Sequence, residues 1–478
     1  MNIRKKAHYK EHNIPAFNNN PLIEVIRPAM DIERFTQKIK IELTVTEDVQ
    51  DLDEFDRELM IELLDTTYIP APEMYTLYKS IVKSIMVGYL HRNPASNATR
   101  KIQHSIATCE GYRLPDKINL SSCIAFIGLS GGGKTIGIEK CFSLLDQVIS
   151  HNGYKGAYLK VDQIVYLKFE APSTKTKKGF ILNFFKAVDE VIDTRYFEEW
   201  KNDKSNIAVL IVEAKKIAFN HHVGVVFIDE IQRCVGDDGK ESKVDKATLN
   251  FIDDFFNSIG ISMIVAGTYA VLPLFRTTMS TARRLSSGRV FECEGIQQEF
   301  FDPVTKEVLV NPFWHVFVAA FYKPQLLKNY FEFDSEIKDV LFYFSQGIQK
   351  LLVRLIKLSY EEAVNSGLEL ITPGLIRDVY YDQFKLLHPA LDALRNGTYG
   401  GYEDLIKNQA ISPTGASLVD LVIDKCASSK SSKAPVLSGD RLYVDVPAAK
   451  QTYIPKEDLR NLRGSNREAL ADAFHGVK

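Results

Sequence analysis

Apolar side chains follow two different patterns along this chain. In one region they form short, nearly continuous runs of strand length, at 122–127, 164–169, 223–228 and 261–266. Between these runs they recur at helical spacing, at 135–149, 180–192, 206–219 and 249–259. Apolar strands that alternate with helices are typical of a mostly parallel sheet covered by helices on both faces. We therefore predict an α/β fold for this region.

Outside this region the pattern is mainly helical. A helix is expected at 72–90, and strands are no longer expected after about residue 305. Thr372 before Pro373 is a favourable helix start, because a capping hydroxyl precedes a proline in the first turn. The later segments with helical spacing predict a second, all-helical domain, and they lie at 311–321, 335–345, 348–365 and 373–387.

Composition narrows the class of protein. Apolar residues make up 45% of the 478-residue chain and charged residues 25%, which is typical of a soluble globular protein. The formal net charge of −2 means that any binding to nucleic acid must use local basic patches. Six scattered cysteines without a CxxC pair argue against a disulfide framework or a zinc site and favour the cytoplasm. No apolar run approaches the ~18 residues of a membrane span, and the first residues do not resemble a signal peptide.

One segment departs from this balanced composition. Residues 42–65 contain ten Asp or Glu residues and a single cation, Arg57. Two interpretations are open: the segment is a solvated helical face, or it is an acidic surface that docks a basic partner.

A glycine-rich loop follows the first predicted strand. Residues 128–135 read GLSGGGKT, which matches the pattern GxxxxGK[ST] between a strand and a helix. Backbone N–H groups of such a loop converge on phosphate oxygens, and the helix N-terminus adds positive potential. Lys134 is expected to reach the β- and γ-phosphates, and Thr135 to bind Mg²⁺ through its hydroxyl. The residues expected to contact ATP are Gly128, Ser130, Gly131, Gly132, Gly133, Lys134 and Thr135.

Two carboxylates end the third predicted strand. Residues 225–230 read VVFIDE, so Asp229 and Glu230 emerge at the carboxyl end of a buried strand, where parallel α/β sheets bind ligands. Asp229 is expected to bind Mg²⁺, mostly through water, and Glu230 to polarise the attacking water. With the glycine-rich loop, they predict an ATPase whose cofactors are ATP and Mg²⁺.

Further polar residues extend the predicted catalytic site. Thr268 follows the fourth predicted strand. It is expected to position the attacking water or to sense the γ-phosphate, and the alternative is a turn that simply ends the strand. Arg276, Arg283, Arg284 and Arg289 follow in a segment with few carboxylates. An arginine that reaches a neighbouring subunit's site stabilises charge on the transferring phosphate. The pair Arg283-Arg284 is the best candidate for this role, and solvated surface arginines are the alternative.

A basic loop is the best candidate for contact with DNA. Residues 173–178 read STKTKK and follow the second predicted strand. Thr174, Lys175, Lys177 and Lys178 are expected to contact backbone phosphates without reading the base sequence. The alternative is a flexible, solvated loop.

The order of these motifs resembles a known family. GLSGGGKT, VYLKF, VVFIDEIQ, IVAGT and STARR follow one another as in the TnsC/TniB group of transposition regulators, which are AAA+ ATPases distantly related to MuB. NNNPLIE, GYLHRNP, LNFFKAVD, FSQG and HPALDALRNG also resemble TnsC of transposons that use a TnsA–TnsB transposase. The resemblance covers roughly residues 12–400. The combination of DEIQ, STARR and HPALDALRNG is more specific than the nucleotide-binding motifs alone.

The resemblance implies an AAA+ P-loop ATPase fold with a C-terminal all-helical lid domain. It implies a homo-oligomer on double-stranded DNA, a ring or helical filament of about six or seven subunits, that binds without sequence preference. ATP-bound protein would link a TnsD- or TniQ-type target selector to a TnsA/TnsB-type transposase, in the bacterial cytoplasm and without a membrane. Lys350 or Arg354 is expected to replace the lid's sensor arginine.

Four consecutive segments are expected. They are an N-terminal extension for partner docking (1–118), a nucleotide-binding core (119–304), a helical lid (305–426) and a flexible tail for partner docking (427–478). The expected function is an ATP-dependent, DNA-binding regulator of DNA transposition that couples target-site selection to transposase recruitment and activation. Two alternatives stay open: an initiator or helicase-loader-like AAA+ protein, and a STAND-type ATP switch without DNA binding.

Overall fold

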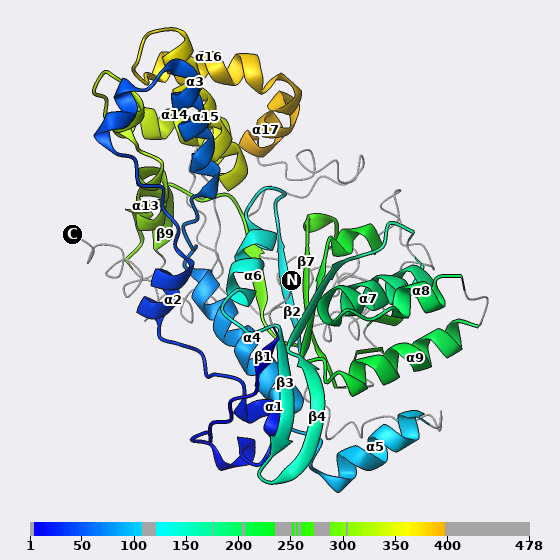
Figure 1. Cartoon of the computed structure of the whole chain (residues 1–478). Helices are drawn as coiled ribbons and strands as arrows, with labels where there is room; N and C mark the ends of the chain where they lie inside the picture. The colour runs from blue at the N-terminus through cyan, green and yellow to red at the C-terminus, as the bar shows by residue number, and fades with distance from the viewer. Residues whose placement is uncertain are drawn as a thin grey trace, which may run out of the picture. The chain divides into compact units, whose positions relative to one another are not determined.

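The computed structural model contains two compact units that share a discontinuous chain (Figure 1). The nucleotide unit comprises residues 1–30, 73–128 and 134–292, and the helical unit comprises residues 31–72, 129–133 and 293–478. The residues that the structure describes are 4–107, 121–174, 176–202, 206–234, 251–252, 255–256, 260–271, 287–302 and 305–396.

A five-stranded sheet forms the centre of the nucleotide unit, with strand order β5-β6-β7-β2-β8. Neighbouring strands run parallel from β5 through β6 and β7 to β2. Every residue of β2 and β7 is buried, which explains their nearly continuous apolar sequences. The strands are β2 (Cys123–Gly128), β5 (Tyr166–Glu170), β6 (Val225–Asp229), β7 (Ser262–Gly267) and β8 (Val290–Cys293).

Helices cover both faces of this sheet (Figure 1). The α4 and α6 helices pack against each other on one face, and α7 and α9 pack against each other on the opposite face. The prediction of a parallel α/β layer is therefore confirmed. The helices of the unit are α1 (Pro21–Glu24), α4 (Glu73–Tyr89), α5 (Asn97–Ala107), α6 (Lys134–Phe142), α7 (Lys177–Ile192), α8 (Tyr196–Trp200) and α9 (Ile207–Asn220).

A second, three-stranded sheet was not expected. The predicted helix at 135–149 was too long, because α6 ends at Phe142 and β3 (Val148–Tyr154) follows. β3 pairs antiparallel with β4 (Ala157–Ile164) and parallel with β1 (Lys5–Lys6). The turn explains the hairpin: Gly153, Lys155 and Gly156 all have positive φ angles, and glycine adopts such angles without strain. The predicted strand at 164–169 also merged two strands, since β4 ends at Ile164 and β5 starts at Tyr166.

A buried polar cluster supports the start of β6. Arg92 donates through Nη1 to the carbonyl of Val223 at 2.6 Å and through Nε to the carbonyl of Gly88 at 2.9 Å. Tyr89 Oη donates to the carbonyl of His222 at 2.7 Å. Burial, reinforced by the neighbouring Arg92 guanidinium, lowers the pKa of His222 to about 3. The cluster therefore holds the Arg92 cation and the neutral His222 imidazole close to the start of β6.

The helical unit has the four helices that the sequence predicts after residue 305. Thr372 caps α16 as expected, since its side chain accepts a hydrogen bond from the Leu375 N–H. The prediction that strands end by about residue 305 was wrong, because β10 (Glu307–Val310) follows that residue. It pairs antiparallel with β9 (Glu299–Asp302), and the turn of this hairpin includes Lys306 at positive φ. The unit's helices are α2 (Ile32–Ile39), α3 (Glu54–Glu62), α13 (Pro312–Ala320), α14 (Ser335–Ser345), α15 (Gln349–Asn365), α16 (Pro373–Gln383) and α17 (His388–Arg395).

Short 3₁₀ turns connect these elements. They are η1 (Pro15–Phe17), η2 (Glu47–Asp51), η3 (Leu63–Thr66), η4 (Ile231–Cys234), η5 (Tyr269–Val271), η6 (Pro324–Leu326) and η7 (Lys385–Leu387). Among the described ranges, no helix is both long and apolar enough to cross a membrane.

Residues 31–72 divide the expected N-terminal extension in two, because they pack in the helical unit. Figure 1 shows α3, in blue, beside the yellow-green helix α15. Arg57 Nη1 and Glu369 Oε2 form a buried ion pair at 2.7 Å. Lys357 Nζ lies 2.7 Å from Glu62 Oε2 and 2.6 Å from Asp65 Oδ2. The expected segment 1–118 is therefore no contiguous unit, and part of its acidic charge is neutralised within the chain.

Candidate functional site: a nucleotide-binding centre

The glycine-rich loop joins β2 to α6 with a backbone that requires glycine. Gly131 and Gly133 have φ angles of 81° and 89°, in the left-handed region where other residues are strained. A Cβ atom at Gly132 would lie 2.8 Å from Cys293 Sγ and 3.2 Å from the carbonyl oxygen of Leu129. The loop is thus shaped so that its backbone is exposed to a ligand, as phosphate binding requires.

Lys134 begins α6 directly after the loop. Its residue is only 8% exposed, and its Nζ donates to the carbonyl of Gly128 at 2.9 Å. The ammonium group is therefore held against the backbone at the end of β2. In this position it supplies a positive charge next to the loop, as contact with β- and γ-phosphates requires.

Thr135, the second residue of α6, meets Asp229 at the end of β6. Thr135 Oγ1 donates to Asp229 Oδ2 at 2.7 Å, and the Glu230 N–H donates to Asp229 Oδ1 at 2.8 Å. Both carboxylate oxygens of Asp229 are thus oriented by the protein. A hydroxyl next to a carboxylate is a hard oxygen donor set, which suits Mg²⁺ bound partly through water. The two residues predicted to bind Mg²⁺ are therefore brought together.

Glu230 follows β6 in an unusual backbone conformation, with a φ of 54°. Such left-handed angles are costly for residues other than glycine and persist where the surroundings impose them. Here the Glu230 carbonyl accepts from the Arg233 N–H at 2.9 Å, which closes the η4 turn. The turn keeps Glu230 at the edge of the sheet where the predicted catalytic carboxylate is required.

Gln232 connects Glu230 to the end of the neighbouring strand. Its Nε2 donates to Glu230 Oε2, and its Oε1 accepts from the Thr268 N–H at 3.2 Å. A Cβ atom at Gly267 would lie 2.8 Å from Gln232 Oε1, so only glycine leaves room for this bridge. Thr268 is linked to Glu230 through Gln232. The sequence analysis missed Gln232 and Gly267, although the stretch DEIQ and the glycine at the strand end were both visible.

The predicted arginine finger and one of the predicted DNA-contact residues fall outside the part of the chain that the structure describes. Arg276, Arg283 and Arg284 lie outside the described residues, as does Lys175. Arg289 is exposed, and its carbonyl accepts from the Ala125 N–H at 2.9 Å.

The rest of the predicted DNA loop leads into α7. Thr176 caps this helix by accepting from the Gly179 N–H at 3.1 Å, and Thr174 Oγ1 lies 3.3 Å from Thr176 Oγ1. Lys177 Nζ lies 5.7 Å from the centre of the Phe251 ring, and Lys178 is half-buried. Thr174 is exposed, so the loop presents hydroxyls and lysines close to the start of a helix.

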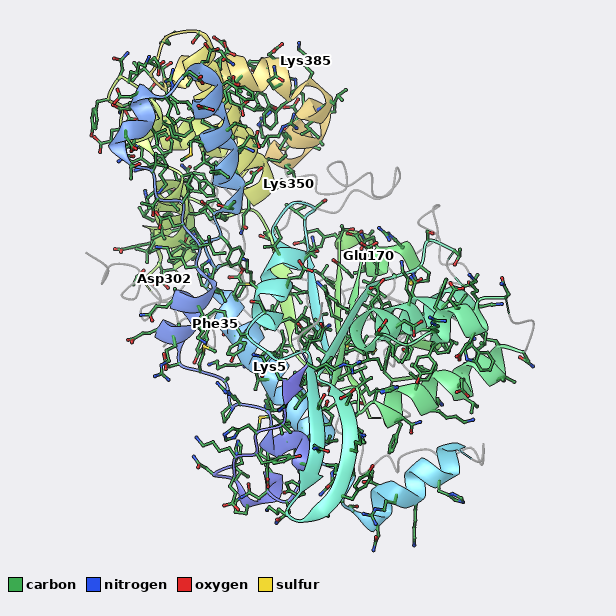
Figure 2. All side chains as sticks on the ribbon, viewed as in Figure 1. Lys5, Phe35, Glu170, Asp302, Lys350 and Lys385 are labelled. Atoms are coloured by element: carbon green, nitrogen blue, oxygen red, sulfur yellow. The ribbon has the colours of Figure 1, made fainter. Side chains whose placement is uncertain are left out.

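The start of α15 contacts the loop residues that belong to the helical unit. The Lys350 N–H donates to the carbonyl of Gly131 at 3.1 Å, and a Cβ atom at Gly133 would lie 2.6 Å from Gln349 Oε1. Figure 2 labels Lys350 at this end of the helix. Arg354, the other expected sensor, donates instead to the Gln383 carbonyl at 3.3 Å. Of the two, only Lys350 is placed at the loop.

The acidic edge of the sheet includes one further ion pair. Arg233 Nη1 lies 2.6 Å from Glu170 Oε2, at the end of β5 (Glu170 is labelled in Figure 2). The Ala171 N–H donates to the carbonyl of Asp229 at 2.8 Å. Among the described residues, no group of three or more His, Cys, Asp or Glu side chains forms a metal site by itself.

A known sequence family covers the region that holds this centre. Residues 118–275 match the family model described as "AAA domain". No curated protein sequence matches the chain. Among solved structures, the Walker-type ATPase PABY2304 of Pyrococcus abyssi is 12% identical, with 69% of this chain and 87% of that chain covered and a TM-score of 0.32. A TM-score this low supports no functional argument.

The chain therefore carries an AAA-type P-loop domain, in which a five-stranded parallel sheet is flanked by helices. The predicted fold class is confirmed. A domain of this type implies nucleotide binding, typically with Mg²⁺.

Proposed function

We propose that the chain hydrolyses ATP at this centre. The observation that carries the proposal is the arrangement of Thr135, Asp229 and Glu230, in which one hydroxyl and two consecutive carboxylate residues are held together by hydrogen bonds. Lys134 and the loop backbone bind the phosphates, and Thr135 and Asp229 hold Mg²⁺, which supplies charge neutralisation when it is bound. Glu230 accepts a hydrogen bond from the attacking water and orients it toward the γ-phosphate.

Two substitutions test this assignment. Lys134→Ala is expected to abolish ATP binding, since the loop loses its cation. Glu230→Gln is expected to retain ATP binding while it lowers turnover by about 100-fold or more, because the general base is lost. Isothermal titration gives the affinity, and phosphate release gives the rate. Glu190→Gln, an exposed carboxylate on α7, is the matched control. Turnover of Glu230→Gln equal to that of the control would remove Glu230 from this role.

We further propose that ATP binding drives assembly of several copies on duplex DNA, in a regulator of DNA transposition. The proposal rests on the resemblance to TnsC/TniB regulators, in particular on DEIQ, STARR and HPALDALRNG, added to the AAA domain. In this role the oligomer couples a TnsD- or TniQ-type target selector to a TnsA/TnsB-type transposase. Hydrolysis ends the assembly. The loop at Thr174, Lys177 and Lys178 binds DNA phosphates, and Arg283 or Arg284 completes the neighbouring site.

Two other functions would use the same nucleotide site. An initiator or helicase-loader-like AAA protein also assembles on DNA, and a STAND-type switch uses ATP without DNA. Filter binding with duplex DNA distinguishes the STAND-type switch, which does not bind DNA, from the proposed transposition regulator, which does. Binding that requires ATP and ignores sequence supports a DNA-assembling protein, and no binding at low salt with ATP and Mg²⁺ excludes it. ATP-dependent capture of a cognate TnsA/TnsB-type transposase distinguishes a transposition regulator from an initiator or loader.

The DNA surface has its own test. In Lys177→Ala/Lys178→Ala, DNA affinity is expected to fall, and the slope of log K against log salt to decrease by about 0.9 for each phosphate that the variant no longer neutralises. The control is Lys186→Ala/Lys201→Ala, two lysines of the same unit that pair with Glu190 and Glu198. Equal slopes in the two variants would place the DNA-binding surface elsewhere on the molecule, while leaving the ATPase assignment intact.

A further inference from the structure

Within the part of the chain that the structure describes, the inner face of α3 anchors the helix in the helical unit. Asp53 caps its N-terminus by accepting from the Asp56 N–H at 2.9 Å. Ile61 and, in the following turn, Leu64 are fully buried, and Arg57 points inward to its ion pair with Glu369. This inner face packs against α15. The position of α3 within the unit is therefore fixed independently of its outer face.

The outer face of α3 carries large apolar side chains. Residues at spacings of three and four lie on one side of a helix, so Phe55, Leu59 and Leu63, at the C-cap, form a line along α3. The line is about 12 Å long, at a rise of 1.5 Å per residue. We call it the α3 stripe, and its members are Phe55 (65% exposed), Leu59 (49%) and Leu63 (43%). Exposed apolar residues that cluster in this way mark interaction sites, whereas scattered ones do not.

Carboxylates border the α3 stripe on both sides. On a helical projection Asp56 lies along one edge and Glu58 along the other, and Glu62, next to Glu58, is paired with Lys357. Arg57, the only cation among residues 47–66, points away from the stripe. Further carboxylates are exposed around the start of α3, and they are Asp48, Asp51, Asp53 and Glu54. The surface thus combines an apolar centre with a negative rim.

We propose that the α3 stripe is a docking surface for a basic amphipathic helix of a partner protein. Leucine-like side chains of the partner cover the stripe, and its lysines or arginines face the carboxylate rim. Recognition must use side chains, because a helix, unlike a sheet edge, offers no unpaired backbone groups along its length. The length of the stripe matches about two turns of a helix packed ridge into groove. The proposal does not depend on ATP or DNA binding.

Charge excludes the other simple occupants. Pairing of two α3 stripes from two copies would place the same carboxylates against each other, and like charges oppose such an interface. Duplex DNA and anionic lipid headgroups are repelled by the same rim. A basic partner gains attraction from every carboxylate that it approaches, and its association is therefore expected to weaken with salt.

The test uses full-length protein and a defined probe. The probe is a fluorescein-labelled synthetic peptide that has leucines at three- and four-residue spacing and lysines at the other positions. The control peptide has the same composition, but its leucines are spread around the helix. Anisotropy is expected to show about tenfold tighter binding of the ordered peptide, corresponding to ~1.4 kcal/mol, and weaker binding at high salt. Equal binding of the two peptides, or no binding, overturns the proposal.

Variants locate the binding. Phe55→Ser/Leu59→Ser is expected to lose the preference for the ordered peptide, while Leu386→Ser, a 95% exposed leucine in η7 of the same unit, retains it. Asp51→Asn/Asp56→Asn is expected to reduce the salt dependence. Thermal unfolding of each variant shows whether the fold is kept, which is expected because all these side chains point outward.

Other occupants give different results. If Phe55→Ser/Leu59→Ser changes the sedimentation coefficient of the protein alone, a second copy covers the stripe. If it changes the proteolytic accessibility of residues 397–478, the chain's own C-terminal segment covers it. Either result overturns the proposal of a separate basic partner.

Discussion

Gln232 shows how one side chain can join two strand ends. Its amide nitrogen donates to the Glu230 carboxylate, and its amide oxygen accepts from the Thr268 backbone at 3.2 Å. In the proposed function Gln232 acts through Glu230, so its role is that of a positioning residue. An amide suits this place because it donates at one end and accepts at the other, while Gly267 leaves the space that it needs.

Loss of this bridge is expected to affect turnover more than binding. For Gln232→Ala we predict a kcat about 10- to 100-fold lower, because the Glu230 carboxylate is no longer held in one orientation, and an ATP affinity within about twofold of the parent. Steady-state ATPase kinetics and isothermal titration measure the two quantities.

The matched variants for Gln232 separate positioning from structure. Gln232→Asn, one methylene shorter, is expected to recover little activity. In a Glu230→Gln background the Gln232→Ala substitution should have almost no further effect on the rate. A loss of equal size in both backgrounds would instead indicate a general structural role for Gln232.

At the scale of elements, the buried pair Arg57–Glu369 attaches α3 to the helical unit. Burial alone would raise the pKa of Glu369, but hydrogen bonds from Arg57 and from the Lys328 backbone lower it below its ordinary value. The carboxylate is therefore stabilised in its charged form, provided that Arg57 is present.

Removal of one partner is expected to destabilise the helical unit. Arg57→Leu leaves a buried, unpaired carboxylate, so the free energy of unfolding is predicted to fall by about 3–5 kcal/mol. The double variant Arg57→Leu/Glu369→Gln should recover much of this loss, because the unpaired charge is gone. Urea unfolding measures the free energies of the single and the double variant. The probe is the fluorescence of Trp314, which is buried in this unit, and the Trp200→Phe substitution removes the other tryptophan. Identical losses in the single and double variants would show that charge burial is not the cause.

Elements differ in how far their own sequence specifies them. The buried strands β2, β6 and β7 were predicted because their apolar runs are local, and the start of α16 could be predicted from Thr372 in the same way. The β3–β4 hairpin was missed because Thr135–Ile149 has helical spacing although α6 stops at Phe142. The place of residues 31–72 depends on contacts such as Arg57–Glu369, which are remote in sequence and leave no local signal.

The same distinction applies to the candidate site. Lys134, Thr135, Asp229 and Glu230 were predicted from short motifs, and the structure places Thr135 against Asp229 and Glu230 directly after it. Gln232 was not predicted, because its role depends on the approach of β7. Arg283 and Arg284 remain predictions, since they lie outside the described residues.

At the scale of the whole molecule, buried histidines make stability depend on pH. Burial lowers the pKa of His151, His221 and His222 below the ordinary value of 6.5, and that of His222 reaches about 3. Between these values and 6.5 the unfolded chain binds more protons than the native chain, so the free energy of unfolding rises with pH in this window. Stability is therefore expected to be lost as pH falls below about 6.5.

Replacement of His222 tests this dependence. His222 has a φ of 46°, which asparagine tolerates better than most residues, so His222→Asn preserves the backbone. We predict that its melting temperature falls less between pH 7.5 and 5.5 than that of the parent. His8→Asn, at an exposed position, is the control and should follow the parent. Parallel curves for His222→Asn and the parent would contradict the role of His222.

The placement of residues 31–72 has a consequence for biosynthesis. Arg57 and Glu369 are separated by 312 positions, so the ribosome releases α3 long before the helices that cover its inner face. Until then Ile61 and Leu64 must remain exposed or be shielded by other proteins, because loops of this length close slowly. The helical unit is thus expected to fold only after synthesis has passed α15 and α16, whereas the parallel sheet can form earlier. A chain shortened to begin at residue 73 would lose part of that late-folding unit and not a dispensable extension.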